Sequence, residues 1–297
     1  MNDLILNIKN LREITGSGYL DCKKALEDNN NSIENAIDFL RKKGLAKATK
    51  KSTRAAKEGA IGIYSNEILT SIIQINTETD FAAKNDIFLN FMDEIGNFSL
   101  EANNKNLTLD QFLNMLFDKR SINDRFKDII AKIGENIILS KLIIVDKNND
   151  SIIVKYVHNS YRKNIGKIVA MIKLRVDHDN DDARRFGKNL CMHIAASKPL
   201  AMNIDQLDKK LIDKEKKVQL ETIKTSGKPD NIIEKILDGK MNKFYTDSVL
   251  LKQHYILEPE KSVEQVVSDF SLKNKLNIIN YELVILGSWW LKIKEYF

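Results

Sequence analysis

The stretch SIIQINTETDFAAKNDIFLNFMDEI, residues 71–95, decides the fold. Its isoleucine-rich start predicts a strand, the polar residues after it predict a turn, and the apolar spacing from Phe88 to Ile95 predicts a helix over residues 81–96. Residues 168–197, IVAMIKLRVDHDNDDARRFGKNLCMHIAAS, repeat this order of strand, turn and helix. Two halves of similar build indicate an α+β fold whose core has two parts.

Further elements of this core follow from the same periodicities. Strands at 60–64 and 69–75 flank a turn at 65–67 and predict a β-hairpin. Beyond the first helix the sequence predicts helices at 108–118, 123–134 and 181–197, and strands at 137–145, 151–157, 167–176 and 276–285.

Residues 1–43 predict a small bundle of three short helices. The first helix carries apolar residues at helical spacing: Leu4, Ile5, Ile8, Leu11 and Ile14. Gly16-Ser17-Gly18 ends it, a second helix is expected over 19–26, and Ser32 is a suitable N-cap for the third. The core of such a bundle is thin, and we expect a module of this kind to bind a partner.

A basic stretch follows the bundle: RKKGLAKATKKSTRAAK, residues 41–57. It has almost no large apolar side chains and cannot bury a hydrophobic face, so it predicts a linker or a solvated helix. We therefore expect a domain boundary here.

A charged helical hairpin is predicted after the second half of the core. Residues 203–227 carry a narrow apolar stripe that is too short for a long coiled coil. Ser226-Gly227-Lys228-Pro229 predicts the turn, and residues 232–244 predict the returning helix. Such a hairpin is able to project from the body of the protein.

The composition limits the function classes. The net charge of +6 and the pI of about 9.0 favour an acidic partner. The two cysteines have no CxxC spacing, which argues against a disulfide framework or a zinc module and favours a reducing cytosol. No apolar run has the length of a membrane span, the N-terminus does not read as a secretory signal, and the common enzyme motifs are absent from the sequence.

Three short motifs each allow a structural interpretation. In Thr79-Asp80-Phe81-Ala82, a cap of the helix with Phe81 packed inward and an exposed aromatic that anchors an interface both remain open. His193 near the end of a predicted helix is best interpreted as a packed or capping histidine. Lys132-Ile133-Gly134-Glu135-Asn136 is most simply a turn from helix to strand.

Taken together, the motifs resemble the elongation factor Ts family, in the order that the family has them. The matching segments are Leu11-Arg12-x-x-Thr15-Gly16-x-Gly18-x-x-Asp21-Cys22-Lys23-Lys24-Ala25-Leu26, Asn76-x-x-Thr79-Asp80-Phe81-x-Ala83-Lys84, Lys132-Ile133-Gly134-Glu135-Asn136, Tyr156-x-His158, His193-Ile194-Ala195-Ala196-Ser197-Lys198-Pro199, Ser226-Gly227-Lys228-Pro229 and Leu257-Glu258-Pro259. The resemblance covers about residues 3 to 285.

The resemblance implies a specific architecture within the α+β class. It divides the chain into a three-helix domain of the ubiquitin-associated (UBA) type at 1–54, a first core part at 55–143, a second core part at 144–203 and 245–285, an inserted coiled-coil-like hairpin at 204–244, and an atypical tail at 286–297. This division agrees with the elements predicted from periodicity.

The resemblance also implies a partner and a mode of action. The partner is elongation factor Tu with bound GDP, and the activity is the exchange of GDP for GTP on that GTPase. Thr79, Asp80, Phe81 and Ala82 would lie beside the Mg²⁺ site of the partner and disturb it. The three-helix domain would contact the nucleotide domain of the partner through residues of the first motif: Leu11, Arg12, Thr15, Gly16, Gly18, Asp21, Cys22 and Lys23.

The same resemblance predicts what the chain does without. It implies no catalytic residue, no metal, no cofactor and no direct contact with nucleic acid or a membrane, in a cytoplasmic protein. The complex would be either 1:1 or a dimer of heterodimers, and the sequence leaves both open.

The sequence departs from the family pattern in three places. Asn159 stands where a glycine usually follows the histidine of Tyr-x-His, and the loop through Asn164 is expected to be longer. Ala82 replaces the more common valine. The tail that contains SWWLKIKEYF does not match the usual ending.

Two other function classes compete with the exchange factor. The charge and the basic stretch favour a protein that binds RNA or DNA, although no aromatic in that stretch could stack on bases. The three-helix bundle alone favours a module that binds ubiquitin-like domains, but this leaves about five-sixths of the chain unexplained.

Overall fold

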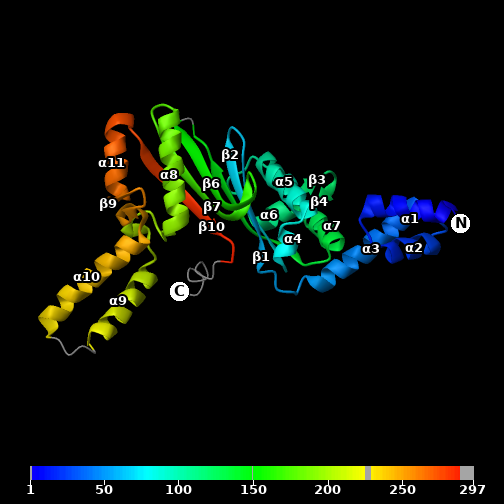
Figure 1. Cartoon of the computed structure of the whole chain (residues 1–297), viewed down its shortest axis with the longest axis horizontal. Coiled ribbons are helices and arrows are strands. Elements are labelled where there is room, and N and C mark those ends of the chain that lie inside the picture. Colours follow the sequence, from blue (N-terminus) through cyan, green and yellow to red (C-terminus); the bar gives the residue numbers. More distant parts are fainter. Residues whose placement is uncertain (1, 149, 225–228, 288–297) are drawn as a thin grey trace. The chain divides into compact units, whose positions relative to one another are not determined.

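The computed structural model describes residues 2–148, 150–224 and 229–287, and it confirms the α+β class (Figure 1). The chain forms two compact units. Unit 1 holds Met1–Asp146 and Ser160–Gly166, and unit 2 holds Lys147–Asn159 and Lys167–Phe297. The predicted hairpin turn at 226–228 and most of the predicted tail at 286–297 lie outside the described residues.

Three helices open unit 1, as predicted, and fit a UBA-like domain: α1 (Asn2–Thr15), α2 (Tyr19–Asp28) and α3 (Ile33–Lys51). Their common core is small: Ile8, Leu11, Cys22, Ala25, Leu26, Ala36 and Leu40. Gly16 has φ +66° and lets the chain leave α1, and the Ser32 hydroxyl accepts a hydrogen bond from the Asn35 amide at the start of α3.

The first part of the basic stretch, residues 41–51, is helical and is not a linker, because α3 continues to Lys51. Gly44 of α3 is buried, and a Cβ at this position would lie 2.8 Å from Cβ of Ala131 in α7 (Ile122–Ile133). A residue without a side chain therefore allows α3 to approach α7 closely. The sequence suggested a solvated helix because it shows charge but not this contact.

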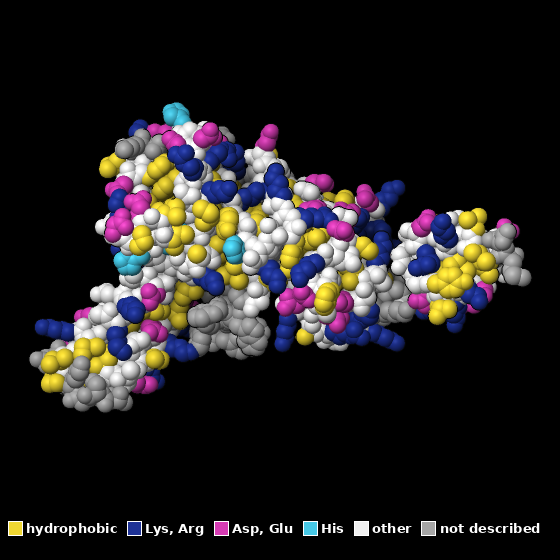
Figure 2. Space-filling view, viewed as in Figure 1, with side chains coloured by type: hydrophobic (Ala, Val, Ile, Leu, Met, Phe, Trp, Pro, Cys, Tyr) yellow, Lys and Arg dark blue, Asp and Glu magenta, His cyan; other side chains and the backbone are white. Residues whose placement is uncertain are grey.

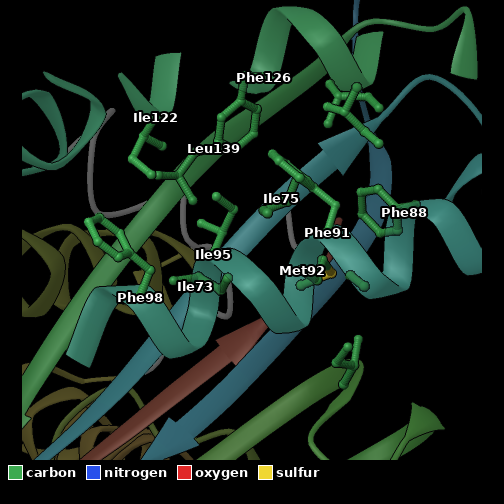
Figure 3. Packing of buried hydrophobic residues seen from close by; sticks show 14 of the residues in the cluster. Ile73, Ile75, Phe88, Phe91, Met92, Ile95, Phe98, Ile122, Phe126 and Leu139 are labelled. Atoms are coloured by element: carbon green, nitrogen blue, oxygen red, sulfur yellow. The ribbon is translucent and has the colours of Figure 1, made fainter. Parts of the chain in front are cut away.

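The rest of unit 1 is a sheet with helices on one face. The antiparallel strands β1 (Glu58–Ser65), β2 (Leu69–Thr77) and β5 (Ile137–Asp146) lie in the order β1-β2-β5, and Ile165 and Gly166 pair with β1. The other elements of this part are α4 (Asp80–Ala83), α5 (Asp86–Glu101), α6 (Leu109–Asn114), β3 (Leu116–Phe117), β4 (Arg120–Ser121) and α7. Figure 3 shows the core between sheet and helices, where Ile73, Ile75 and Leu139 meet Phe88, Phe91, Met92, Ile95 and Phe126.

One contact in this core is unusually close. A Cβ on Gly96 of α5 would lie 2.0 Å from Cε2 of Tyr64, which is buried in β1. The Tyr64 hydroxyl donates to Oδ1 of Asp93 at 3.2 Å, so the ring is held at its far end as well. Glycine at position 96 is therefore required for α5 to lie on the sheet.

Unit 2 has a second sheet-and-helix layer, as the repeated sequence predicts. It contains β6 (Ser151–Arg162, of which the last three residues belong to unit 1), β7 (Ile165–Arg175, of which the first two residues belong to unit 1), α8 (Asp181–Ser197), β8 (His254–Tyr255), β9 (Glu258–Ser262), α11 (Val263–Asn274) and β10 (Asn277–Ile285). Strand β7 pairs with both β6 and β10. Side chains of α8 and α11 pack on the strands, and the Phe186 and Phe270 rings stack at 4.1 Å.

The predicted hairpin is present as α9 (Lys209–Lys224) and α10 (Asp230–Ser248). It has its own small core of Ile223, Leu237 and Met241, distinct from a cluster at its base that contains Ala201, Leu207 and Val249. None of the helices in the described ranges has the length and apolar character of a membrane span.

Three predicted elements differ from the structure. The helix expected over 81–96 is broken between α4 and α5, because the Asn85 side chain caps α5 by accepting from the Ile87 amide. The helix expected over 108–118 ends at Asn114. The longer loop through Asn164 is wrong, because β6 continues to Arg162.

The backbone conformation of Asn159 accounts for its place at a position where the resemblance leads us to expect a glycine. Its φ of +50° lies in the left-handed region, which glycine adopts without strain and asparagine adopts more readily than most residues. The departure at this position is therefore compatible with the same backbone.

Candidate functional site

The candidate site is the single helical turn α4 that follows β2. On the face drawn in Figure 2, hydrophobic side chains (yellow) lie among basic (dark blue) and acidic (magenta) ones. The Thr79 hydroxyl accepts from the Ala82 amide at 3.3 Å and caps the turn. Ala82 and Ala83 face the core and are buried, whereas Phe81 is 81% exposed. The interpretation that packs Phe81 inward is therefore wrong, and the turn presents an aromatic side chain to the outside.

Glu135 braces this turn from 56 residues away. Its carboxylate accepts two hydrogen bonds from Thr79, from the backbone amide at 2.9 Å and from the hydroxyl at 2.7 Å. The Thr77 hydroxyl also donates to the Thr79 carbonyl at 2.7 Å. Hydrogen bonds to an ionised carboxylate are stronger than neutral ones, so Thr79 is held firmly beneath the exposed Phe81.

Sequence reasoning assigned Glu135 only to a turn between helix and strand. That turn exists, with Gly134 at φ +87° ending α7, but the carboxylate has the additional contact to Thr79. The only available signal was a charged residue two positions before a strand, and this does not identify a partner so distant in sequence.

Asp80 lies at the first position of the exposed turn and forms an ion pair with Lys84 at 2.7 Å. The hydrogen bond to Asp80 raises the pKa of Lys84. Both side chains are about half exposed, and such surface pairs contribute little to stability. Asp80 can therefore change partners at low cost when another protein contacts this surface.

The candidate residues of the three-helix domain divide into core and surface. Leu11 and Cys22 are fully buried, so they shape the domain from inside. Thr15 and Asp21 are half-buried: the Thr15 hydroxyl donates to the Leu11 carbonyl at 2.6 Å, and Asp21 forms an ion pair with Lys43 at 2.8 Å.

The remaining four candidates are exposed: Arg12, Gly16, Gly18 and Lys23. Sequence reasoning missed Tyr19 and Leu20, which begin α2 and are 48% and 77% exposed. The usable signal was two large side chains in the first turn of a helix, and Phe81 likewise lies in the first turn of its helix.

His193 is a packed histidine, as predicted. It is fully buried in α8, its Nε2 lies 3.0 Å from Oε1 of Gln253, and its Nδ1 accepts from the Ile256 amide at 3.3 Å. The Gln253 amide nitrogen donates to two carbonyls, so its oxygen faces the ring and Nε2 carries the proton. Burial lowers the pKa of His193, and the hydrogen bond to Gln253 offsets part of this effect.

We expect His193 to make the stability of unit 2 depend on pH. Because its pKa is lower in the folded than in the unfolded chain, the unfolded chain binds more protons once the pH falls below the ordinary histidine pKa of about 6.5. The contribution is complete above that pH and is lost as the pH falls to the folded pKa, with a slope of at most about 1.4 kcal/mol per pH unit for one group. Urea unfolding from pH 8 to 5, compared with His193→Gln, measures it. Identical pH profiles for the two proteins would contradict this role.

Other reactive groups are already engaged. Both cysteines are buried, and burial raises the pKa of each thiol. A pocket of about 490 Å³ between α5 and α7 contains Arg120 and Arg125, but these pair with Asp128 and Glu94. Within residues 2–148, 150–224 and 229–287, no group of three or more His, Cys, Asp or Glu side chains could hold a metal.

The feature that remains is the turn α4, which is held by Glu135 and exposes the aromatic side chain of Phe81. This geometry is suited to contact with another protein.

Comparisons with known proteins agree with the motifs. A family model described as "Elongation factor TS" matches residues 78–288. The chain is 39% identical over 262 residues to elongation factor Ts of Rhizobium meliloti (strain 1021), an alignment that covers 88% of this chain and 85% of that protein. Elongation factor Ts of Bartonella henselae is 37% identical over 264 residues, with the same two coverages.

Proposed function

Because the chain belongs to the elongation factor Ts family, whose members promote nucleotide exchange on elongation factor Tu in translation elongation, we propose that Phe81 is the group that opens the GDP site of that partner. The observation that carries the proposal is the 81% exposure of Phe81 on a turn in which Thr79 is held by hydrogen bonds and Ala82 and Ala83 are buried. Members of this family exchange a bound nucleotide and do not catalyse a chemical reaction.

The chemistry of the partner's site explains why a wedge is sufficient. A GTPase holds GDP through a phosphate loop and through Mg²⁺, which bridges phosphate and protein oxygens. Mg²⁺ requires near-ideal octahedral geometry, so a small shift of the supporting segment weakens the site strongly. Phe81 would insert between side chains of the partner, and Asp80 would perturb the polar groups and waters around the ion. The ion leaves indirectly, and none has to remain on this chain.

The bracing of the turn supports this role. A side chain that enters a partner loses conformational freedom, and a fixed backbone lowers this cost of binding. Thr79 is fixed by Glu135 and by its own cap on the turn, while Ala82 and Ala83 are held in the core. Phe81 is therefore presented in a defined direction before the partner arrives.

The three-helix domain supplies a second contact in this proposal. Arg12 of α1 and Lys23 of α2 are exposed cations, and Tyr19 and Leu20 at the start of α2 are exposed as well. This combination suits an acidic, amphipathic surface of the nucleotide domain of elongation factor Tu. In this proposal the net charge of +6 favours binding to that acidic partner and not to nucleic acid. The protein acts in the cytoplasm. We leave 1:1 and dimer-of-heterodimers assemblies as the two forms to be distinguished by mass measurement.

Release of a fluorescent GDP from elongation factor Tu, followed by stopped flow, tests the proposed function. We expect the protein to accelerate release in a saturable manner. Linkage adds an internal check: GDP must weaken binding of the factor by the same ratio by which the factor weakens binding of GDP. Absence of acceleration would contradict the proposal, and RNA binding at increasing salt would then test the competing function.

The hairpin is expected to be dispensable for exchange. The buried residues Ile223, Leu237 and Met241 lie within the hairpin, whereas Leu207 is buried at its base and Phe244 packs against both clusters, so the cut must leave Leu207 and Phe244 in place. Replacement of residues 213–241 by a short Gly-Ser linker should leave the release rate within about twofold of the wild type, because the buried residues that it removes, Ile223, Leu237 and Met241, pack within the hairpin and not on the sheets. Loss of all exchange in a deletion variant with an intact circular dichroism spectrum would contradict this prediction.

A further inference from the structure

A second set of hydrogen bonds joins the turn that carries Phe81 to the end of the three-helix domain. We call this set the junction; it consists of Ser52, Arg54, Glu78 and Asn136. All four residues belong to unit 1, and Asn136 is 1% exposed at its centre. The junction lies next to Glu135 and Thr79 in sequence but uses different atoms.

Asn136 contacts both sides of the junction. Its side-chain amide donates to the carbonyls of Ser52 at 3.3 Å and of Arg54 at 2.7 Å, directly after α3. Its backbone amide donates to Oε1 of Glu78 at 2.7 Å, directly before the capping Thr79. One residue therefore holds the exit of the three-helix domain and the entry of the exposed turn.

Two further contacts close the arrangement. Arg54 forms an ion pair with the other oxygen of Glu78 at 3.5 Å, and the Lys51 ammonium donates to the Gly134 carbonyl at the end of α7. Segments 51–54, 78–79 and 134–136 are thus linked pairwise. Because buried polar groups are costly to leave unpaired, displacement of any one segment disturbs the other two.

We propose that Asn136 is a positioning residue for nucleotide exchange, which makes the three-helix domain and the Phe81 turn engage the partner as one preorganised surface. The inference rests on the proposed function for its consequence, but the coupling itself is a property of the free protein. Two contacts on one rigid frame act as a bivalent ligand, whereas loosening of the frame lowers the effective concentration of the second contact.

The substitution Asn136→Asp tests the coupling in the full-length chain. It keeps the size of the side chain but replaces the two-fold donor with an acceptor that faces two carbonyl oxygens. Gln253→Glu is the matched control, because Gln253 is 4% exposed and its amide also donates to two carbonyls, those of Ser197 and Asp247 in unit 2. Each variant loses two hydrogen bonds from a buried amide to backbone carbonyls, but only Asn136→Asp changes a residue of the junction.

The first readout is hydrogen–deuterium exchange of the free protein. We expect the amides of residues 78–84 to exchange at least about fivefold faster in Asn136→Asp, the factor that corresponds to one of the two lost hydrogen bonds, and at the wild-type rate in Gln253→Glu. Unchanged exchange in Asn136→Asp overturns the inference. Equally accelerated exchange in both variants overturns it too, because the effect would then be general loosening.

The second readout is the release of fluorescent GDP from elongation factor Tu. In Asn136→Asp the maximal release rate should fall about fivefold, while the half-saturating concentration changes less, because the surface of the three-helix domain is intact. A wild-type maximal rate together with accelerated amide exchange overturns the positioning role. If the wild-type protein itself releases no GDP, the proposed function fails while the amide-exchange result still decides the coupling.

A second variant protects the test against misfolding of the first. Glu78→Gln retains an oxygen for the Asn136 amide but removes the charge that pairs with Arg54, at a side chain that is 22% exposed. It should change both readouts in the same direction as Asn136→Asp and by a smaller factor. Wild-type values for both readouts in Glu78→Gln would overturn the closed arrangement of the junction.

Discussion

Replacement of Phe81 by alanine is expected to lower the maximal rate of GDP release at least about 30-fold, which corresponds to about 2 kcal/mol or more for an interface anchor. The side chain is 81% exposed, so the loss arises in the complex and not in the folded protein. The urea midpoint and the circular dichroism spectrum should therefore equal those of the wild type. Stopped-flow release at saturating factor concentration is the measurement that checks this.

The matched control for this variant is Leu272→Ala. Leu272 in α11 is 84% exposed and apolar, but it lies in unit 2 and outside the candidate site. Its replacement should leave the release rate unchanged. If Phe81→Ala releases GDP as fast as the wild type, the wedge has to be abandoned, although the exchange function could stand on other contacts. A Phe81→Ala protein that unfolds would not count for or against the wedge.

The second large effect is expected for Glu135, which never touches the partner in our proposal. Glu135→Ala removes both acceptors of Thr79, and hydrogen bonds to charged groups contribute about 1.5–3 kcal/mol each, so we expect the maximal release rate to fall at least about tenfold. Glu135→Gln keeps one acceptor oxygen and should give an intermediate rate. Stopped-flow release for the series Glu, Gln, Ala at this position provides the measurement.

A graded series separates bracing from simple stability. If Glu135 only stabilised unit 1, the release rate of folded protein would not follow the number of acceptors left to Thr79. Equal release rates for all three proteins, each shown to be folded at the assay temperature, would contradict the bracing role. Thr79→Val should lower the release rate further than Glu135→Gln, because it leaves the hydrogen bond from the Thr79 amide to Glu135 but removes both the one from the hydroxyl and the cap on the Ala82 amide.

The elements that the sequence predicted well are those whose ends are fixed by local interactions. The helix expected at 181–197 has those bounds in the structure, because the Asn180 side chain accepts from the Ala183 amide at one end and Lys198, at φ +49°, leaves the helix before Pro199 at the other. The strand predicted at 276–285 also agrees with β10, which begins one residue later and ends at the same residue. Local caps and a regular apolar pattern carry this information within a few positions.

The break between α4 and α5 shows the limit of that approach. The apolar pattern continues across Lys84 and Asn85, so periodicity alone joined the two helices. Asn85 instead caps the second helix, a competition between side chain and backbone that an apolar pattern does not reveal. The consequence for function is direct, because the break frees one turn to present Phe81.

The candidate site was predictable only in part for a related reason. The sequence singled out Thr79 to Ala82 as a short motif between a strand and a helix, but it did not decide which way Phe81 points. That direction depends on Ala82 and Ala83 facing the core, and the bracing depends on Glu135 and Asn136, more than 50 residues away. Non-local hydrogen bonds of this kind leave no periodic signal in the chain.

The contact between Gly96 and Tyr64 constrains how the sequence can change over generations. A side chain on residue 96 would collide with the buried ring, whereas a smaller residue at position 64 would leave a cavity that costs about 3–5 kcal/mol for loss of an aromatic. Either change made first passes through a less stable protein, and an organism that carries it would face selection against that step. We therefore expect these two positions to persist together in a lineage, or to be replaced together in a single repacked core.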